Sequence, residues 1–156
     1  MADANTNIQQ VGVDEIRGHP GVQALFERHY EEVALHKDVM QLDPSWDHYY
    51  ALEEQGMLLV LGVFVDQVLV GYSVNFFDGH LHHQQSQVCY NDLLFVDPSH
   101  RRGRLGLRLV HATEDAARQR GACLILWQAK PHTALDTLLL RQGYGVQDII
   151  YSKALN

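Results

Sequence analysis

The first part of the chain combines a polar start with segments whose apolar residues recur at helical spacing. After a polar tail over residues 1–7, a short extended piece is expected near residues 8–13. Apolar side chains then recur three and four residues apart, which predicts a helix over residues 22–36 with one buried face. A second, shorter helix is predicted over residues 46–55, because the proline and serine just before it are typical of a helix start.

The middle of the chain changes to patterns that are typical of strands. Residues 57–77 contain two apolar runs separated by Asp66 and Gln67, which predicts two antiparallel strands joined by a tight turn. Residues 78–87 are polar, so a loop or an edge hairpin is expected there. A further apolar strand is predicted over residues 88–96.

The last third of the chain predicts a helix, a strand, a second helix and a final strand in succession. A helix over residues 105–120 carries its apolar side chains on one stripe and is followed by Gly121, a typical C-terminal signal. Residues 122–129 form a short apolar run, so the strands on either side of the helix are expected to be parallel, joined by a right-handed crossover. A last helix over residues 133–142 and a closing strand over residues 146–154 follow.

A basic turn lies between the strand that ends at Val96 and the helix that begins near Leu105. Four of the 12 lysine and arginine residues fall in or beside this turn, although the net charge of the chain is −7. They are Arg101, Arg102, Arg104 and Arg108. Converging backbone N–H groups and the positive end of a helix both bind anions. The turn therefore predicts a site for one phosphorylated small molecule, and the acidic total argues against nucleic acid.

Composition adds the expected class of protein. A chain of 156 residues that is 46% hydrophobic and 20% charged predicts one globular domain with a sizeable core. Cys89 and Cys123 lie in apolar runs without a metal-binding spacing, so reduced thiols are expected. No apolar run is long enough to span a bilayer, and the N-terminus lacks the pattern of a leader. A cytoplasmic protein with no membrane partner is expected.

The basic turn also carries a family signature. The segment VDPSHRRGRLG matches the pattern V-x-P-x-x-[QR]-x-x-[GA]-x-[GA] at Val96, Pro98, Arg101 and Gly106. Together with the order of the predicted elements, it resembles the acetyl-CoA signature of the GCN5-related N-acetyltransferase (GNAT) family. A weaker match to that family is LLLRQGY at residues 138–144. The resemblance covers nearly the whole chain.

The resemblance implies an α/β (α+β) fold in a single GNAT domain over residues 1–156, with residues 1–7 as a flexible tail. The expected central sheet is mixed and mostly antiparallel, with six to seven strands, a parallel splayed central pair and about four flanking helices. The implied reaction transfers an acetyl group from acetyl-CoA, bound as co-substrate, to a primary amine of a small molecule or peptide. It proceeds by direct attack in a ternary complex, and no metal is expected.

The resemblance also implies which residues bind acetyl-CoA. They lie at the end of the strand, in the basic turn, in the first turn of the next helix and at the start of the last helix. The expected residues are Leu94, Phe95, Val96, Arg101, Arg102, Gly103, Arg104, Leu105, Gly106, Leu107 and His132.

Three of the family's usual residues are replaced in this chain. Arg104 stands where the family has its middle glycine, and its side chain could wrap onto the phosphates of coenzyme A. Leu139 occupies the position of the usual general-acid tyrosine, so the leaving thiolate must be protonated from elsewhere or from water. His132 replaces a frequent asparagine that hydrogen-bonds the pantetheine arm.

The candidate general bases lie on the strand before the signature. Strand alternation predicts that Tyr90, Asp92, Leu94 and Val96 share one face. Relatives often carry a glutamate base at the position of Tyr90. Because tyrosine is a poor base at neutral pH, Asp92 is the first candidate, acting directly or through a water, and Tyr90 is the second. The alternative for Asp92 is a structural hydrogen bond, which is the commoner role of a polar residue at a strand end.

Other interpretations stay open at this point. The altered acid and base positions would also suit a catalytically weak or inactive acyl-CoA-binding module. The histidines of GHLHH, namely His80, His82 and His83, favour a solvent-exposed loop over a metal site, although they could border the amine site. The acidic residues of the first helices fit either a cationic substrate or a solvated helix face. The apolar residues Ile149, Ile150 and Tyr151 could pair across a homodimer.

Overall fold

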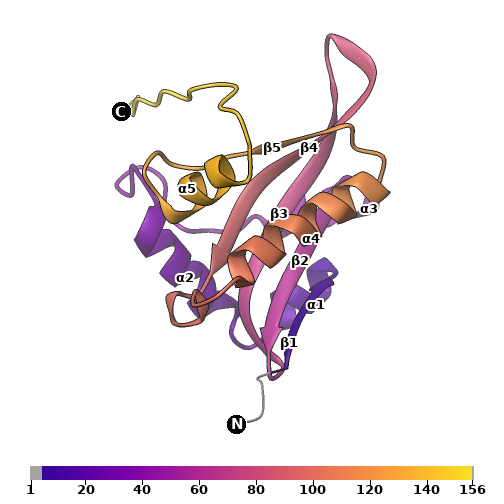
Figure 1. Cartoon of the computed structure of the whole chain (residues 1–156). Coiled ribbons are helices and arrows are strands. Elements are labelled where there is room, and N and C mark those ends of the chain that lie inside the picture. The colour runs from indigo at the N-terminus through magenta and orange to yellow at the C-terminus, as the bar shows by residue number, and fades with distance from the viewer. Residues whose placement is uncertain (1–4, 156) are drawn as a thin grey trace.

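Figure 1 shows the computed structural model of the protein, which describes residues 5–155. One five-stranded sheet in the order β1-β2-β3-β4-β5 is flanked by helices. Neighbouring strands are antiparallel except for the parallel pair β4 and β5. The elements are β1 (Thr6–Gln10), α1 (Val13–Gly18), α2 (Val22–Val33), α3 (Trp46–Glu54), β2 (Leu58–Val65), β3 (Val68–His80), β4 (His83–Val96), α4 (Leu105–Gln119), β5 (Leu124–Trp127) and α5 (Ala134–Arg141).

The predicted fold class is confirmed. Helices α2 to α5 each begin within one residue of the position that the sequence predicts. Asp66 and Gln67 form the turn between β2 and β3, and their positive φ angles of 48° and 69° are those of a tight hairpin turn. None of the described helices combines the length and the apolar character that crossing a membrane requires.

The structure adds one element in the first two-thirds of the chain and decides between two alternatives. Helix α1 has no counterpart among the predicted elements, because its six residues are too few to show a helical repeat of apolar positions. Of the loop and the edge hairpin expected over residues 78–87, the structure has the hairpin, since β3 and β4 continue into this segment. Backbone pairing supports the extension, and the side chains of β4 there are mostly exposed.

The predicted closing strand over residues 146–154 is wrong, and the described sheet has five strands rather than six to seven. A strand at the edge of β5 would need alternating residues with one buried face, whereas Ile149, Ile150 and Tyr151 are consecutive apolar residues. All three are exposed, at 70%, 75% and 88%. The homodimer that this segment could form stays a prediction.

Each face of the sheet carries its own apolar core. The first core packs α1, α2 and α3 against one face, and it includes Leu25, Phe26, Tyr72 and Phe95. The second core packs α4 against the other face, and it includes Leu109. The sheet is therefore the middle of three layers, and β4 contributes side chains to both cores.

Helix α2 is held to the sheet by a buried histidine. His29 is only 8% exposed, its Nδ1 lies 2.6 Å from the hydroxyl oxygen of Tyr72, and its ring stacks on Phe95 at 4.6 Å. Burial lowers the pKa of His29 to about 4, and the nearby charge of Glu32 offsets only part of this effect. His29 is therefore neutral in the folded protein at physiological pH.

The buried histidine predicts a loss of stability in acid. Below pH 6.5 the unfolded chain protonates His29 while the folded chain does not, so stability falls as the pH drops from 6.5 towards 4. We expect His29 to contribute about 3 kcal/mol to the difference in free energy of unfolding between pH 7 and pH 4. Urea denaturation at both pH values measures that difference, which should shrink in His29→Gln. The exposed His111→Gln is the control, and an equal drop in all three proteins would contradict the prediction.

Candidate active site

A single unpaired residue interrupts β4, the strand next to the edge strand β5. Opposite β3, Leu93 pairs with Val74 and Asn91 pairs with Asn75, so Asp92 has no partner in the ladder. This is a β-bulge, which increases the local twist and changes which face the following side chains occupy.

The bulge corrects the predicted alternation along β4. Cys89 before the bulge and both Leu94 and Val96 after it pack in the core beneath α4. Leu93 and Phe95 instead pack against the core beneath α2. The expectation that Tyr90, Asp92, Leu94 and Val96 share one face is therefore wrong, because it assumed an unbroken period of two.

The parallel strands β4 and β5 part at the same place. Their ladder runs from the pair Val88 and Leu124 to the pair Asn91 and Trp127, where β5 ends. Residues 93–96 of β4 continue beyond it and pair only with β3, on the opposite side, while Asp92 pairs with neither strand. We call the β5-facing side of residues 92–96 the unpaired edge of β4. Its backbone N–H and C=O groups can bind an extended ligand as a further strand would.

The unpaired edge runs directly into the basic turn. Gly103 has φ of 87°, a left-handed conformation that suits glycine. Arg104 is the N-cap residue of α4, and its side chain makes no capping hydrogen bond. The first N–H groups of this 15-residue helix, those of Leu105, Gly106 and Leu107, therefore carry the usual positive end of a helix without an internal partner.

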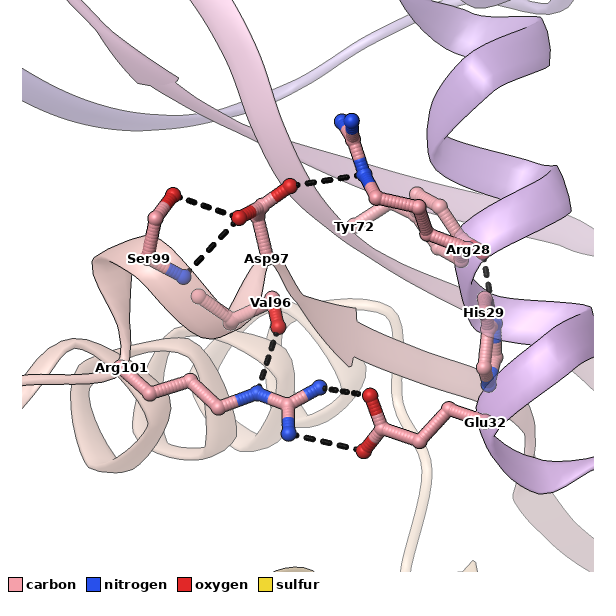
Figure 2. A network of polar contacts seen from close by, with 8 residues as sticks. All are labelled: Arg28, His29, Glu32, Tyr72, Val96, Asp97, Ser99 and Arg101. Atoms are coloured by element: carbon pink, nitrogen blue, oxygen red, sulfur yellow. Dashed lines mark hydrogen bonds and ion pairs between the residues drawn. The ribbon is translucent and has the colours of Figure 1, made fainter.

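The arginines of the turn fall into two groups. Arg101 is bound within the protein: its Nε donates to the backbone oxygen of Val96 at 2.7 Å, and its two terminal nitrogens donate to the carboxylate of Glu32, each at 2.7 Å (Figure 2). Within residues 5–155, Arg102, Arg104 and Arg108 are exposed and make no ion pair. The structure thus leaves these three guanidinium groups open to an anion.

Asp97 connects the start of the turn to α2, the helix that also carries Glu32. It accepts hydrogen bonds from the backbone and side chain of Ser99 and pairs with Arg28 of α2 at 2.8 Å (Figure 2). Burial alone would raise the pKa of Asp97, but the bonds from Ser99 and the charge of Arg28 together lower it. Helix α2 therefore holds the turn at two points.

Asp92 lies at the bulge beside α3. Its side chain is accessible, yet desolvation by the surrounding protein raises its pKa. Burial, with a contribution from the charge of Asp92, raises the pKa of Tyr49 in α3 to about 12. Tyr90 is half-buried and stacks on Phe76 at 5.2 Å. The structure thus stacks Tyr90 on the ring of Phe76 and leaves Asp92 as the accessible carboxylate near the unpaired edge.

The other predicted site residues lie around α5. Leu139 is buried at 7% exposure and offers no proton. His132 is exposed with φ of 65°, and its backbone N–H donates to Asp136 at 2.8 Å, so it sits just before the helix. Tyr144, after α5, meets the ring of Trp127 edge-on at 6.4 Å.

Several acidic residues suggested for a cationic substrate have structural partners. Glu31 pairs with Lys37, Glu32 pairs with Arg101, and Glu53 accepts from the backbone N–H of Val13. Glu53 also lines a hollow of about 510 Å³ with Arg120, but Arg120 is already bound to the backbone oxygen of Leu58. Of the two interpretations, these contacts favour a solvated helix face over a site for a cationic substrate.

The histidine and cysteine expectations concern two further groups of residues. The side chain of His80 lies outside the described part of the structure, so the hypothesis for GHLHH stays a prediction. Among the described residues, no group of three or more potential metal ligands gathers. Both cysteines are free thiols, and burial raises the pKa of Cys89 to about 11.

Sequence reasoning missed Glu32 and Trp127 as neighbours of the site. Glu32 belongs to a helix that is 69 residues away from Arg101 along the chain, and no local pattern links them. Trp127 is the last residue of an apolar strand, and its large polar-tipped ring at a strand end was the available signal.

Comparisons with known proteins agree with this architecture. The sequence model described as the acetyltransferase (GNAT) family matches residues 21–144. None of the curated proteins matches the sequence. Among solved structures, a GCN5-related N-acetyltransferase from Ralstonia eutropha JMP134 is 19% identical with a TM-score of 0.75, and the match covers 97% of this chain and 100% of that one.

Two further structures illustrate the range of similar proteins. An aminoglycoside acetyltransferase from an uncultured soil metagenomic sample, in complex with sisomicin, is 18% identical with a TM-score of 0.74 and 97% coverage of both chains. A glucosamine-6-phosphate N-acetyltransferase from Arabidopsis thaliana is 12% identical with a TM-score of 0.71, covering 97% of this chain and 99% of that one. At these identities the likeness supports the shared fold.

The contact between Glu32 and Arg101 predicts how the turn is held. In Glu32→Gln we expect faster backbone hydrogen exchange over residues 97–104, because the guanidinium loses its bidentate carboxylate partner. Both side chains are more than a third exposed, so global stability should fall by no more than about 1 kcal/mol. Glu31→Gln removes a neighbouring carboxylate that pairs with Lys37 and is the control. Exchange in the turn that is the same in both variants would contradict the assignment.

Proposed function

Because the chain belongs to the GNAT acetyltransferase family, we propose that it is an enzyme that transfers the acetyl group of acetyl-CoA to a primary amine of a small molecule or peptide. The observation that carries this proposal is the unpaired edge of β4, which leads directly into the uncapped N-terminus of α4. An extended chain that carries amides and ends in phosphates matches both parts of this surface.

The residues of the site fit coenzyme A in two stretches. The backbone of the unpaired edge, including Leu94, Phe95 and Val96, would pair with the amides of the pantetheine arm. The N–H groups at the start of α4 would hold the diphosphate, with charge supplied by Arg102, Arg104 and Arg108. Arg101 acts on the same ligand by holding the turn, since its guanidinium is bound to Glu32. His132 lies at the start of α5, where it would face the pantetheine arm.

Asp92 is the residue to which we assign the base. Acetyl-CoA supplies an activated thioester whose sulfur leaves readily. Asp92 removes a proton from the amine, directly or through a water, as the nitrogen bonds to the acetyl carbon and the carbon–sulfur bond breaks. A backbone N–H of the unpaired edge stabilises the negative charge that develops on the thioester oxygen. The sulfur takes its proton from water, because Leu139 is apolar and buried.

A second candidate function is an acyl-CoA-binding module without effective catalysis. Leu139 favours this candidate, because a buried apolar side chain stands where relatives place the general acid. Mixing the protein with acetyl-CoA and a panel of amines, and titrating free thiol, separates the two. Binding with no thiol release would support the module.

Arg104 predicts a measurable contribution to cofactor binding. We expect Arg104→Ala to weaken binding of coenzyme A about tenfold by calorimetry, the loss of one charge-assisted contact to phosphate. Arg118→Ala, in the last turn of α4 and paired with Asp115, is the control and should bind as the wild type does. Repeating the titration with 3′-dephospho-coenzyme A shows which phosphate Arg104 contacts. Equal affinity of both variants for coenzyme A would remove Arg104 from the site.

Asp92 predicts the pH dependence of turnover. Asp92→Asn should lower kcat by about a hundredfold or more and leave acetyl-CoA affinity unchanged. The base must be ionised to accept a proton, and burial raises the pKa of Asp92. As the pH is lowered, kcat/KM of the wild type should therefore begin to fall at a pH above the usual pKa range of an aspartate. Tyr90→Phe is measured in parallel, and a larger loss there would transfer the role to Tyr90.

A further inference from the structure

A fully buried polar cluster interrupts the apolar core beneath α4. Ser73, Asn75, Asn91 and Thr113 are each 0% exposed. The hydroxyl oxygens of Thr113 and Ser73 lie 3.0 Å apart, within hydrogen-bond distance, and Asn75 Nδ2 donates to Ser73 Oγ at 3.0 Å. The cluster thus connects β3, β4 and α4 through side chains alone.

The orientation of the Asn91 amide in this cluster is determined by its neighbours. Its Nδ2 donates to Asn75 Oδ1 at 2.8 Å and to the backbone oxygen of Leu93 at 3.1 Å. A flipped amide would bring Asn91 Oδ1 against these two oxygens, which is unfavourable. In the observed orientation Asn91 Oδ1 is buried and has no hydrogen-bond partner. Because the nitrogen faces β3, the oxygen is directed away from β3.

The indole of Trp127 presents the complementary case. Its Nε1 is also buried and has no hydrogen-bond partner. Asn91 and Trp127 are partners in the last pair of the β4–β5 ladder, at the point where the two strands part. The pair of residues two positions earlier, Cys89 and Ile125, packs in the core beneath α4, so Asn91 and Trp127 share that face.

An acceptor and a donor that lack partners are costly inside a protein. Each typically costs about 1–3 kcal/mol, and native proteins leave few such groups. Here both come from the same pair of residues, and that pair directly precedes the unpaired edge of β4, where the proposed ligand would bind. A ligand that carries one acceptor and one donor would satisfy both atoms.

We propose that Trp127 and Asn91 bind the acyl end of the donor through their side chains, an inference that rests on the proposed function. The Trp127 N–H donates to the thioester oxygen, and Asn91 Oδ1 accepts from the amide N–H of the pantetheine arm nearest the sulfur. Trp127 therefore adds a side-chain donor to the backbone groups of the unpaired edge. Both residues contact the reactive end of the molecule, whereas the arginines contact its phosphates.

Trp127→Phe removes the N–H and retains an aromatic ring beside Tyr144. Without ligand, its melting temperature should equal or exceed that of the wild type, because a buried donor without a partner has been removed. Acetyl-CoA should bind about tenfold more weakly by calorimetry, whereas coenzyme A, which has no thioester oxygen, should lose less than twofold. A structural role alone would lower the melting temperature and leave this ratio unchanged.

Trp46→Phe is the matched control, since it makes the same change at the other tryptophan. Trp46 stacks on Phe26 on the opposite face of the sheet, so its variant should bind both ligands as the wild type does. It also assigns the two indole N–H signals of the ¹⁵N spectrum. The Trp127 indole proton should move downfield with acetyl-CoA and much less with coenzyme A.

Each negative outcome has a separate meaning. If the wild type binds both ligands and Trp127→Phe keeps the wild-type ratio with an unmoved indole signal, the inference is wrong, and an internal water satisfies the two atoms. If the wild type binds neither ligand, the proposed function fails and the inference fails with it. A Trp127 effect of equal size on both ligands would place the contact on the pantetheine arm and overturn the assignment to the thioester oxygen.

Discussion

The unpaired residue Asp92 in β4 is the constraint on which the rest of the site depends. One extra residue in the ladder with β3 turns the following side chains to new faces and increases the twist of the strand. The partner strand β5 ends opposite Asn91, the residue just before the bulge. The two strands consequently part at one side of the sheet, and β5 covers only part of the outer edge of β4, whose backbone stays open beyond Asn91.

The turn beyond this opening is positioned from the opposite face of the sheet. Arg28 of α2 pairs with Asp97, which precedes the turn, and Glu32 of α2 pairs with Arg101 within it. Such partly exposed ion pairs contribute little to global stability, yet the bidentate contact fixes the orientation of the Arg101 side chain. The buried contact between His29 and Tyr72 anchors the same helix. Helix α2 thus links the apolar core to the basic turn.

The buried polar atoms of this protein fall into two groups, those with a hydrogen-bond partner and those without one. The cluster around Ser73 satisfies most of its donors and acceptors internally, and so it can stay dry. Among residues 5–155, the two buried side-chain atoms without a hydrogen-bond partner belong to Asn91 and Trp127, where the two strands part. The proposed contacts with the acyl end of the donor would satisfy both.

Local patterns in the sequence determined the order of most elements, the tight turn at Asp66 and the basic turn before α4, because helical spacing, turn residues and clustered arginines act over a few positions. The same patterns failed for the closing strand, since pairing at a sheet edge depends on which backbone N–H and C=O groups of the edge strand are free to pair. Only the tertiary structure decided that Asp92 is a bulge, that Arg101 faces Glu32 and that Asn91 lies beside Trp127. Strand register and contacts between distant segments set these three features, and they have no signature within a short stretch of chain.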